Sequence, residues 1–214
     1  MFAVLFEVHP KSEKWDDYLG LAKLLKPELE AVPGFMANVR YRSLTREGWL
    51  LSLSTWQNEK ALVRWRTQAV HHGAQERGRF EIFGDYHLRV GEAVGKWTAE
   101  SAADETEIGA GTAVTYVESS RPANWVKNTA PEEIAAALGL CADAPGLVAW
   151  DVFEAILTPG DLLLLMTARD RITAHTAEQK LPVGGATLHR VRIVRDYGMF
   201  DRHEAPQYYP DVKR

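Results

Sequence analysis

The sequence is poor in cysteine and has no long apolar run. Its 214 residues include one cysteine, Cys141, which leaves no second thiol for a disulfide within the chain. The chain opens directly on a strand-like pattern, without a basic segment that leads into an apolar stretch and a cleavage site. Its apolar runs, such as residues 162–166, are far shorter than the roughly 20 residues that span a bilayer. We therefore expect a cytoplasmic protein that does not contact membranes.

Basic charge and cofactor motifs are also missing. The formal net charge is −4 and the isoelectric point is near 6.0, which gives no basic field for nucleic acid. The glycines at 109 and 111 precede a strand pattern instead of a helix, so they do not form a nucleotide-binding loop. His71 and His72 are adjacent and cannot both face one metal ion from a helix. We expect no nucleic acid partner, no metal and no nucleotide cofactor.

A segment of small and acidic residues divides two regions with regular patterns. This segment covers 98–111 and contains almost no large apolar side chain. It predicts a linker between a domain at 1–97 and a second, divergent domain at 112–200, followed by a tail at 201–214.

The two regions show the same order of elements. The first predicts strands at 2–9, 35–43, 49–56 and 82–94, with helices at 14–31 and 59–76. The second predicts strands at 112–119, 147–157, 162–167 and 186–197, with helices at 131–140 and 169–178. The Pro-Gly pair at 145–146 occupies the place that the pair at 33–34 has in the first region. The fold class is therefore α+β, with two tandem ferredoxin-like βαββαβ units and antiparallel sheets.

A repeated unit of this kind can build a two-sheet barrel within one chain. We expect the two units to pack as an intrachain pseudo-dimer, as two copies of a single-unit protein would. The sequence is also compatible with a homodimer of two such chains.

Residues 2–95 resemble the antibiotic biosynthesis monooxygenase family. The resemblance rests on the segments 50–56, 65–75 and 83–90. It implies a dimeric α/β barrel with a cavity between sheet and helices, in which some members oxygenate electron-rich aromatic substrates with O2 and no cofactor. Other members bind and degrade haem, so the resemblance supports the fold more closely than the reaction.

The candidate active-site residues cluster around the second predicted helix. Spacings of three and four place Trp65 and His72 on one stripe, with His71 about 100° away, whereas the resemblance favours His71. A histidine could act as general base on a phenol or hydroquinone. The candidate catalytic residues are His71, His72, Trp65 and Tyr86, and the candidate substrate-binding residues are Trp56, Arg40 and Phe6.

The leading hypothesis is a cofactor-independent monooxygenase that oxidises a small aromatic or quinol-like molecule with O2. The first alternative is haem binding or degradation, in which His71 or His72 would ligate the iron. The second is a non-catalytic module for ligand binding or assembly. The tryptophans could also be plain core and the histidines solvated at a helix end. We expect the active pocket in residues 1–95, with the second unit as its structural partner.

Overall fold

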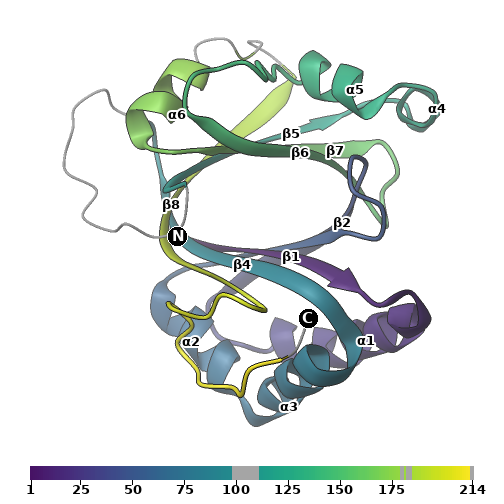
Figure 1. Ribbon diagram of the computed structural model, residues 1–214, viewed down its shortest axis with the longest axis vertical. Coiled ribbons are helices and arrows are strands. Elements are labelled where there is room, and N and C mark those ends of the chain that lie inside the picture. Colours follow the sequence, from purple (N-terminus) through teal and green to yellow (C-terminus); the bar gives the residue numbers. More distant parts are fainter. Residues whose placement is uncertain (98–110, 179–180, 182–184, 213–214) are drawn as a thin grey trace.

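The chain forms two stacked units around a shared antiparallel barrel. The computed structural model describes residues 1–97, 111–178, 181 and 185–212, so most of the predicted linker lies outside the described residues. Helices of the first unit cover one side of the barrel, and helices of the second unit cover the opposite side (Figure 1). The predicted α+β class with two tandem ferredoxin-like units is confirmed.

The first unit has the predicted βαββαβ order, with its second helix divided in two. In β1 the residues at odd positions, such as Leu5, face the barrel interior, and those at even positions, such as Phe6, face the helices. Both faces of the sheet are thus covered, which explains why its strands carry apolar residues on both sides. The elements are β1 (Phe2–Pro10), η1 (Ser12–Lys14), α1 (Trp15–Glu30), β2 (Phe35–Ser43), β3 (Leu50–Trp56), α2 (Glu59–Thr67), α3 (Ala69–Arg77), η2 (Gly78–Ile82) and β4 (Phe83–Val94).

The second unit repeats the plan with shorter helices. An additional short helix, α4, precedes the predicted one, and an apolar cluster that includes Ile134 and Leu164 joins these helices to their sheet. The elements are β5 (Ala113–Ser120), α4 (Ala123–Lys127), α5 (Pro131–Ala137), β6 (Leu147–Ala155), β7 (Asp161–Ala168), α6 (Arg171–Glu178) and β8 (Ala186–Gly198).

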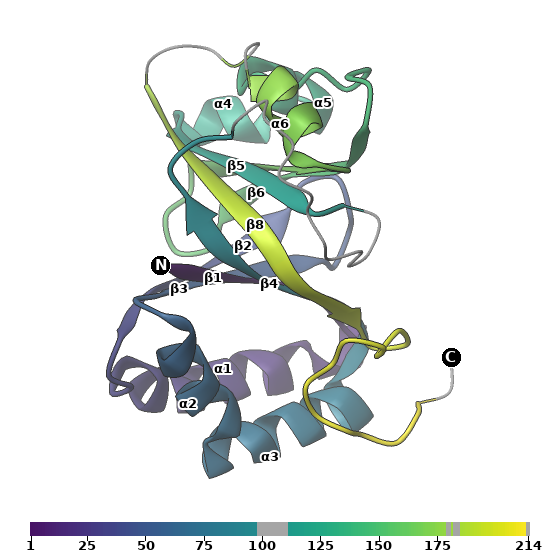
Figure 2. The same ribbon diagram turned by 90° about the vertical axis from the view of Figure 1, so that its left-hand side faces the viewer.

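Strand pairing closes the two sheets into one barrel. The strand order is β1-β3-β2-β6-β7-β5-β8-β4, and each neighbouring pair is antiparallel. The junction between β2 and β6 is short, from Tyr41 to Ser43, whereas β4 pairs with β8 from His87 to Val94. Strand β8 therefore runs from the second unit deep into the first, where it extends the sheet beyond β4 (Figure 2).

Charged side chains at one end of the barrel interior join the two units. Buried Glu7 accepts a hydrogen bond from Arg89 at 2.7 Å, and Arg89 also donates to Thr167 of β7 at 2.6 Å. Arg46 bridges Glu7 and Asp151 of β6. Burial acts to raise the pKa of Glu7, but Arg89 and Arg46 outweigh it and hold the pKa below its usual value. The carboxylate stays ionised because two guanidinium groups contact it.

A break at Gln68 corrects the prediction of one continuous helix over 59–76. Gln68 adopts an extended conformation, with φ −65° and ψ 134°, which ends α2 and starts α3 in a new direction. The helical stripe that placed Trp65 and His72 together therefore does not exist. Instead, His71 folds back over Trp65, and their rings stack with centroids 4.1 Å apart.

No helix among the described residues is both long and apolar enough to cross a bilayer.

Candidate active site

A cavity of about 200 Å³ lies between the first unit's sheet and helices α1–α3. Its floor consists of two rows of residues that run across five strands, from β2 through β3, β1 and β4 to β8. The pairing register aligns each row, so the members are neighbours across the sheet. The first row is Arg40, Ser52, Phe6, Leu88 and Tyr197, and the second is Asn38, Ser54, Val4, Val90 and Arg195.

The two rows make the floor apolar in the middle and polar at both ends. The β2 end offers an amide, hydroxyls and Arg40, whereas the β8 end offers Arg195 and Tyr197. Strands lie about 4.8 Å apart, so four spacings separate the ends by roughly 19 Å. A small ligand with an apolar body and polar groups at its ends would fit such a floor.

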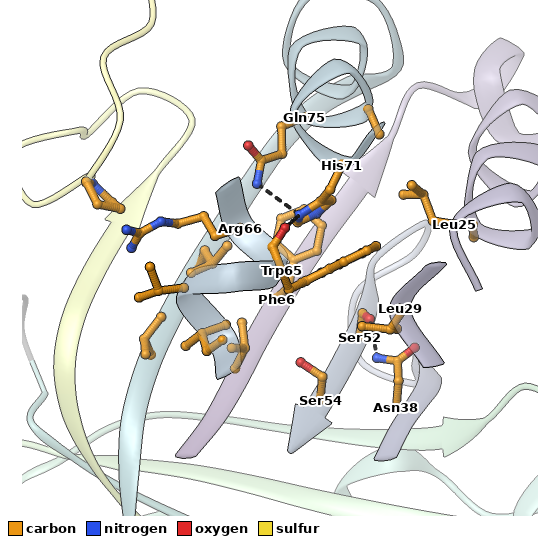
Figure 3. A pocket seen from close by; sticks show the side chains of 18 of the residues that line it. Phe6, Leu25, Leu29, Asn38, Ser52, Ser54, Trp65, Arg66, His71 and Gln75 are labelled. Carbon is orange, nitrogen blue, oxygen red and sulfur yellow. Dashed lines mark hydrogen bonds between the residues drawn. The ribbon is translucent and has the colours of Figure 1, made fainter. Parts of the chain in front are cut away.

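The roof of the cavity is formed by α1, α2 and α3. Apolar side chains of α1, among them Leu25 and Leu29, cover the β2 side (Figure 3). Trp65 and His71 lie over Phe6 near the centre, and Arg66 extends from α2 toward the β8 side (Figure 3). The histidine is thus placed above the apolar middle of the floor.

His71 is held in one neutral form. Its Nδ1 lies 3.0 Å from the carbonyl oxygen of Trp65, and the amide of Gln75 lies 3.3 Å from the same atom. Because a carbonyl can only accept, the shorter contact places the proton on Nδ1 and leaves the lone pair on Nε2, and the Gln75 NH2 group then does not donate to Nδ1. Burial lowers the pKa of His71 to about 4, although the bond to the Trp65 carbonyl acts to raise it. No hydrogen bond to Nε2 is seen within the described part of the chain.

Three guanidinium groups line this mostly apolar space. They belong to Arg40, Arg66 and Arg195. The Nε atoms of Arg40 and Arg66 are buried and have no hydrogen-bond partner among the described residues. A buried donor without a partner is costly, so these groups are available to a ligand oxygen.

The structure brings together four of the seven predicted site residues. Phe6, Arg40, Trp65 and His71 all line the cavity.

The other three lie outside the cavity wall. Trp56 is fully buried, donates its indole N–H to Ser54 at 3.0 Å and packs edge-on against Phe35. Tyr86 is buried beside Phe6, with ring centroids 5.7 Å apart. Exposed His72 faces the C-terminal segment, where its Nδ1 lies 3.1 Å from the Tyr209 hydroxyl.

The Tyr86 hydroxyl joins the C-terminal segment to the first unit. It accepts hydrogen bonds from Arg79 at 3.2 Å and from Arg202 at 2.8 Å. Arg79 is 2% exposed and also donates to the carbonyls of Met199 and Pro210. Tyr86 therefore positions the segment that passes beside the cavity.

The second half of the chain contributes residues that the sequence did not indicate. Arg195 and Tyr197 reach the cavity because β8 pairs with β4, and Pro206 of the C-terminal segment borders it as well. The pocket is thus not confined to residues 1–95. Within the first half, the serines at 52 and 54 could have indicated the cavity, because they are polar side chains on the face of a strand that the helices cover.

Among the described residues, no group of three or more histidine, cysteine or carboxylate side chains is placed to hold a metal ion.

Comparison with known proteins adds two sequence matches. The family model described as antibiotic biosynthesis monooxygenase matches residues 1–77. A relative from Pyricularia oryzae strain 70-15, named jasmonate monooxygenase ABM, is 43% identical over 222 aligned positions. That alignment covers 98% of this chain and 99% of the relative.

Solved structures show more distant likeness. A crystal structure of an antibiotic biosynthesis monooxygenase is 18% identical, with a TM-score of 0.40, and covers 44% of this chain and 99% of that chain. A monooxygenase-like protein from Listeria innocua is 11% identical, with a TM-score of 0.32, and covers 90% of this chain and 94% of its own.

Proposed function

Because this chain belongs to the antibiotic biosynthesis monooxygenase family, we propose that it oxygenates a small, largely apolar molecule in the cavity beneath His71. The observation that carries the proposal is the position of His71, which lines the cavity while its Nδ1 lies 3.0 Å from the Trp65 carbonyl oxygen. A partly buried imidazole that donates from Nδ1 and stays neutral offers Nε2 as a proton acceptor at physiological pH.

The favoured substrate is a small carboxylic acid of the jasmonate kind. The 43% identical relative is named for jasmonate, a compact acid with a ring ketone and an apolar side chain. The cavity has the matching distribution of polarity, with an apolar centre between two polar ends. Its volume of about 200 Å³ is somewhat larger than the roughly 150 Å³ of an engineered cavity that holds benzene.

The chemistry requires no electrons beyond those of the substrate. His71 Nε2 removes a proton from a methylene group that a neighbouring carbonyl or electron-rich ring activates, and Arg40 donates a hydrogen bond to the developing oxyanion. The carbanion reduces O2, the resulting peroxide anion takes the proton back from His71, and the hydroperoxide then loses water. In balance, one methylene group and one O2 molecule give one carbonyl group and one water molecule, so one oxygen atom stays in the product and the other leaves as water.

A second candidate substrate is an aromatic or quinol-like molecule. The aromatic rings of Phe6 and Trp65 in the cavity wall favour it, since they can stack on a planar ring. A phenolic O–H is also more acidic than a C–H beside a ketone, so a weak base such as His71 would deprotonate it more readily.

The size of the cavity does not favour haem. Pockets for drug-sized ligands occupy roughly 300–1,000 Å³, and haem is larger than most such ligands. The cavity of about 200 Å³ falls below this range. The stacked Trp65 ring further restricts access to His71.

Oxygen consumption by the purified protein tests the proposal. We expect O2 uptake with jasmonic acid in the absence of added cofactor, and one 18O atom in the product by mass spectrometry when 18O2 is supplied. Uptake with a hydroquinone panel alone would favour the second candidate. Binding without O2 uptake for every compound would contradict a catalytic function and support a binding module.

A further inference from the structure

The β8 end of the cavity carries two arginines that have no carboxylate partner among the described residues. Arg66 and Arg195 line it, and within the described residues neither has a carboxylate oxygen within 4.0 Å. Many other arginines of the structure do have such a partner. The paired set includes Arg42, Arg46, Arg77, Arg89, Arg169, Arg190 and Arg192.

Two further guanidinium groups lie around the Tyr86 hydroxyl, outside the cavity lining. Arg79 and Arg202 bind only neutral oxygens among the described residues, namely the Tyr86 hydroxyl and backbone carbonyls. The guanidinium of Arg202 lies 5.7 Å from the centre of the Tyr197 ring. Arg79 is buried and Arg66, Arg195 and Arg202 are partly buried. Positive charge that is shielded from water without a negative partner is costly, so these groups favour a bound anion.

The neighbouring groups are also suited to an anion. Burial raises the pKa of Tyr197 to about 12, so its hydroxyl remains protonated and can donate a hydrogen bond. The buried Nε of Arg66 has no partner among the described residues. Glu59 is the acidic residue of the cavity lining, but it is exposed and precedes Arg66 by seven residues, about 10.5 Å along the helix axis.

We propose that Arg66, Arg195 and Tyr197 bind the carboxylate of the substrate and thereby determine its specificity. This inference rests on the proposed function. It orients the substrate with its acid group at the β8 end, its apolar body over Phe6 and its other polar group toward Arg40. Two of the three anchoring side chains come from the second unit, which gives that unit a direct part in substrate recognition.

Binding measurements with matched acids and esters test the anchor. We would titrate the full-length protein with jasmonic acid and methyl jasmonate, and with octanoic acid and methyl octanoate, by calorimetry at pH 7. Charge-assisted hydrogen bonds predict that each acid binds about 10- to 100-fold more tightly than its ester. In the Arg66→Gln/Arg195→Gln variant this preference should fall to about twofold or less.

Two control variants separate the anchor from a general effect of charge or folding. Arg64→Gln removes the same charge from an exposed position of α2 and should leave the preference for the acid unchanged. Arg195→Lys keeps the charge and should retain part of the preference. The melting temperature of each variant is measured alongside.

The outcomes distinguish the anchor from the proposed function. Equal binding of acid and ester by the parent protein, or no binding of either acid, would overturn the anchor. So would an unchanged preference in the folded double variant. If the parent protein nevertheless consumes O2 with methyl jasmonate, the monooxygenase proposal stands while the anchor fails. If acids bind through the arginines but no O2 is consumed, the anchor stands and the proposed function fails.

Discussion

His71 and His72 are consecutive residues with opposite surroundings. His71 is largely enclosed between Trp65 and the cavity, and the Trp65 carbonyl fixes its tautomer. His72 is exposed and stacks against Tyr209, with ring centroids 5.7 Å apart. The two side chains therefore allow a matched comparison, because the same substitution at neighbouring positions should affect different properties.

Replacing His71 by Gln should remove most of the activity. Glutamine keeps a hydrogen-bonding side chain but cannot accept the proton, so turnover should fall by about 10²- to 10⁴-fold. His72→Gln should retain turnover within about threefold, because that side chain does not line the cavity. Steady-state O2 uptake measures both variants. Loss of activity in a folded His72→Gln protein, with His71→Gln still active, would reverse the assignment.

The lowered pKa of His71 also predicts how stability depends on pH. With a folded pKa of about 4 and an ordinary unfolded value near 6.5, the unfolded chain binds the extra proton first as pH falls. The contribution of His71 to stability is therefore complete above pH 6.5 and is lost progressively toward pH 4. Urea unfolding at pH 7 and pH 5 should show a loss of the order of 2 kcal/mol in the parent protein that His71→Gln lacks. Equal losses in both proteins would contradict this.

At the scale of elements, the junction between β4 and β8 brings the second unit into the site. The register shifts between Val90 and Gly91, where the strands approach closely. A Cβ added at Gly91 would lie 2.3 Å from a Val191 methyl carbon and 2.6 Å from the Arg192 carbonyl oxygen. Glycine is therefore required here by the close approach of two backbones. Because Val90 pairs with Arg195, the same junction sets the position of that arginine.

Gly91→Ala should be destabilising. The added methyl group must displace backbone of β8, which we expect to cost about 1–3 kcal/mol. Gly73 of α3 is the matched control, since beyond the local backbone of its own helix nothing lies within 4 Å of an added Cβ. Gly73→Ala should stabilise by about 0.5–1 kcal/mol through helix propensity. Chemical unfolding measures both. A Gly91→Ala protein as stable as the parent would show that β8 can shift without lowering the free energy of unfolding.

The elements of the first unit could largely be predicted from the sequence, because hydrophobic periodicity and turn residues depend on interactions between residues that are close in the chain. The break at Gln68 could not, since neither proline nor glycine marks it. It depends on tertiary contacts, including the bond from the Gln68 amide to Glu28 of α1 at 3.0 Å. The same limit applies to the site: Trp65 and Phe6 were indicated by their type, whereas Arg195 depends on a strand pairing between distant segments.

At the scale of the whole molecule, the C-terminal segment returns from the second unit to the helices of the first (Figure 2). The Tyr209 hydroxyl contacts His72 and Gln75, and Gln207 lies beside the backbone of Arg66. Pro206 borders the cavity at the end where Arg66 and Arg195 lie. The predicted tail is thus in contact with the helices that cover the cavity.

Deleting residues 206–214 should weaken substrate binding more than it slows the reaction. Without Pro206 the β8 end of the cavity is open to water, so we expect KM to rise about tenfold while kcat stays within about threefold. Tyr209→Phe, which loses only the hydroxyl contacts, should show a smaller rise in KM. A truncated protein with unchanged KM and the parent melting temperature would show that the segment does not contribute to binding.

The closed barrel has a consequence for inheritance. In a symmetric pair of identical chains, any substitution appears in both subunits, so both pockets change together. In this protein each half has its own stretch of sequence, and a substitution alters one half alone. The second half could therefore lose catalytic residues of its own, while its last strand gained residues such as Arg195 that line the cavity of the first half. Joining the halves in one chain thus frees each of them to acquire a separate task over generations.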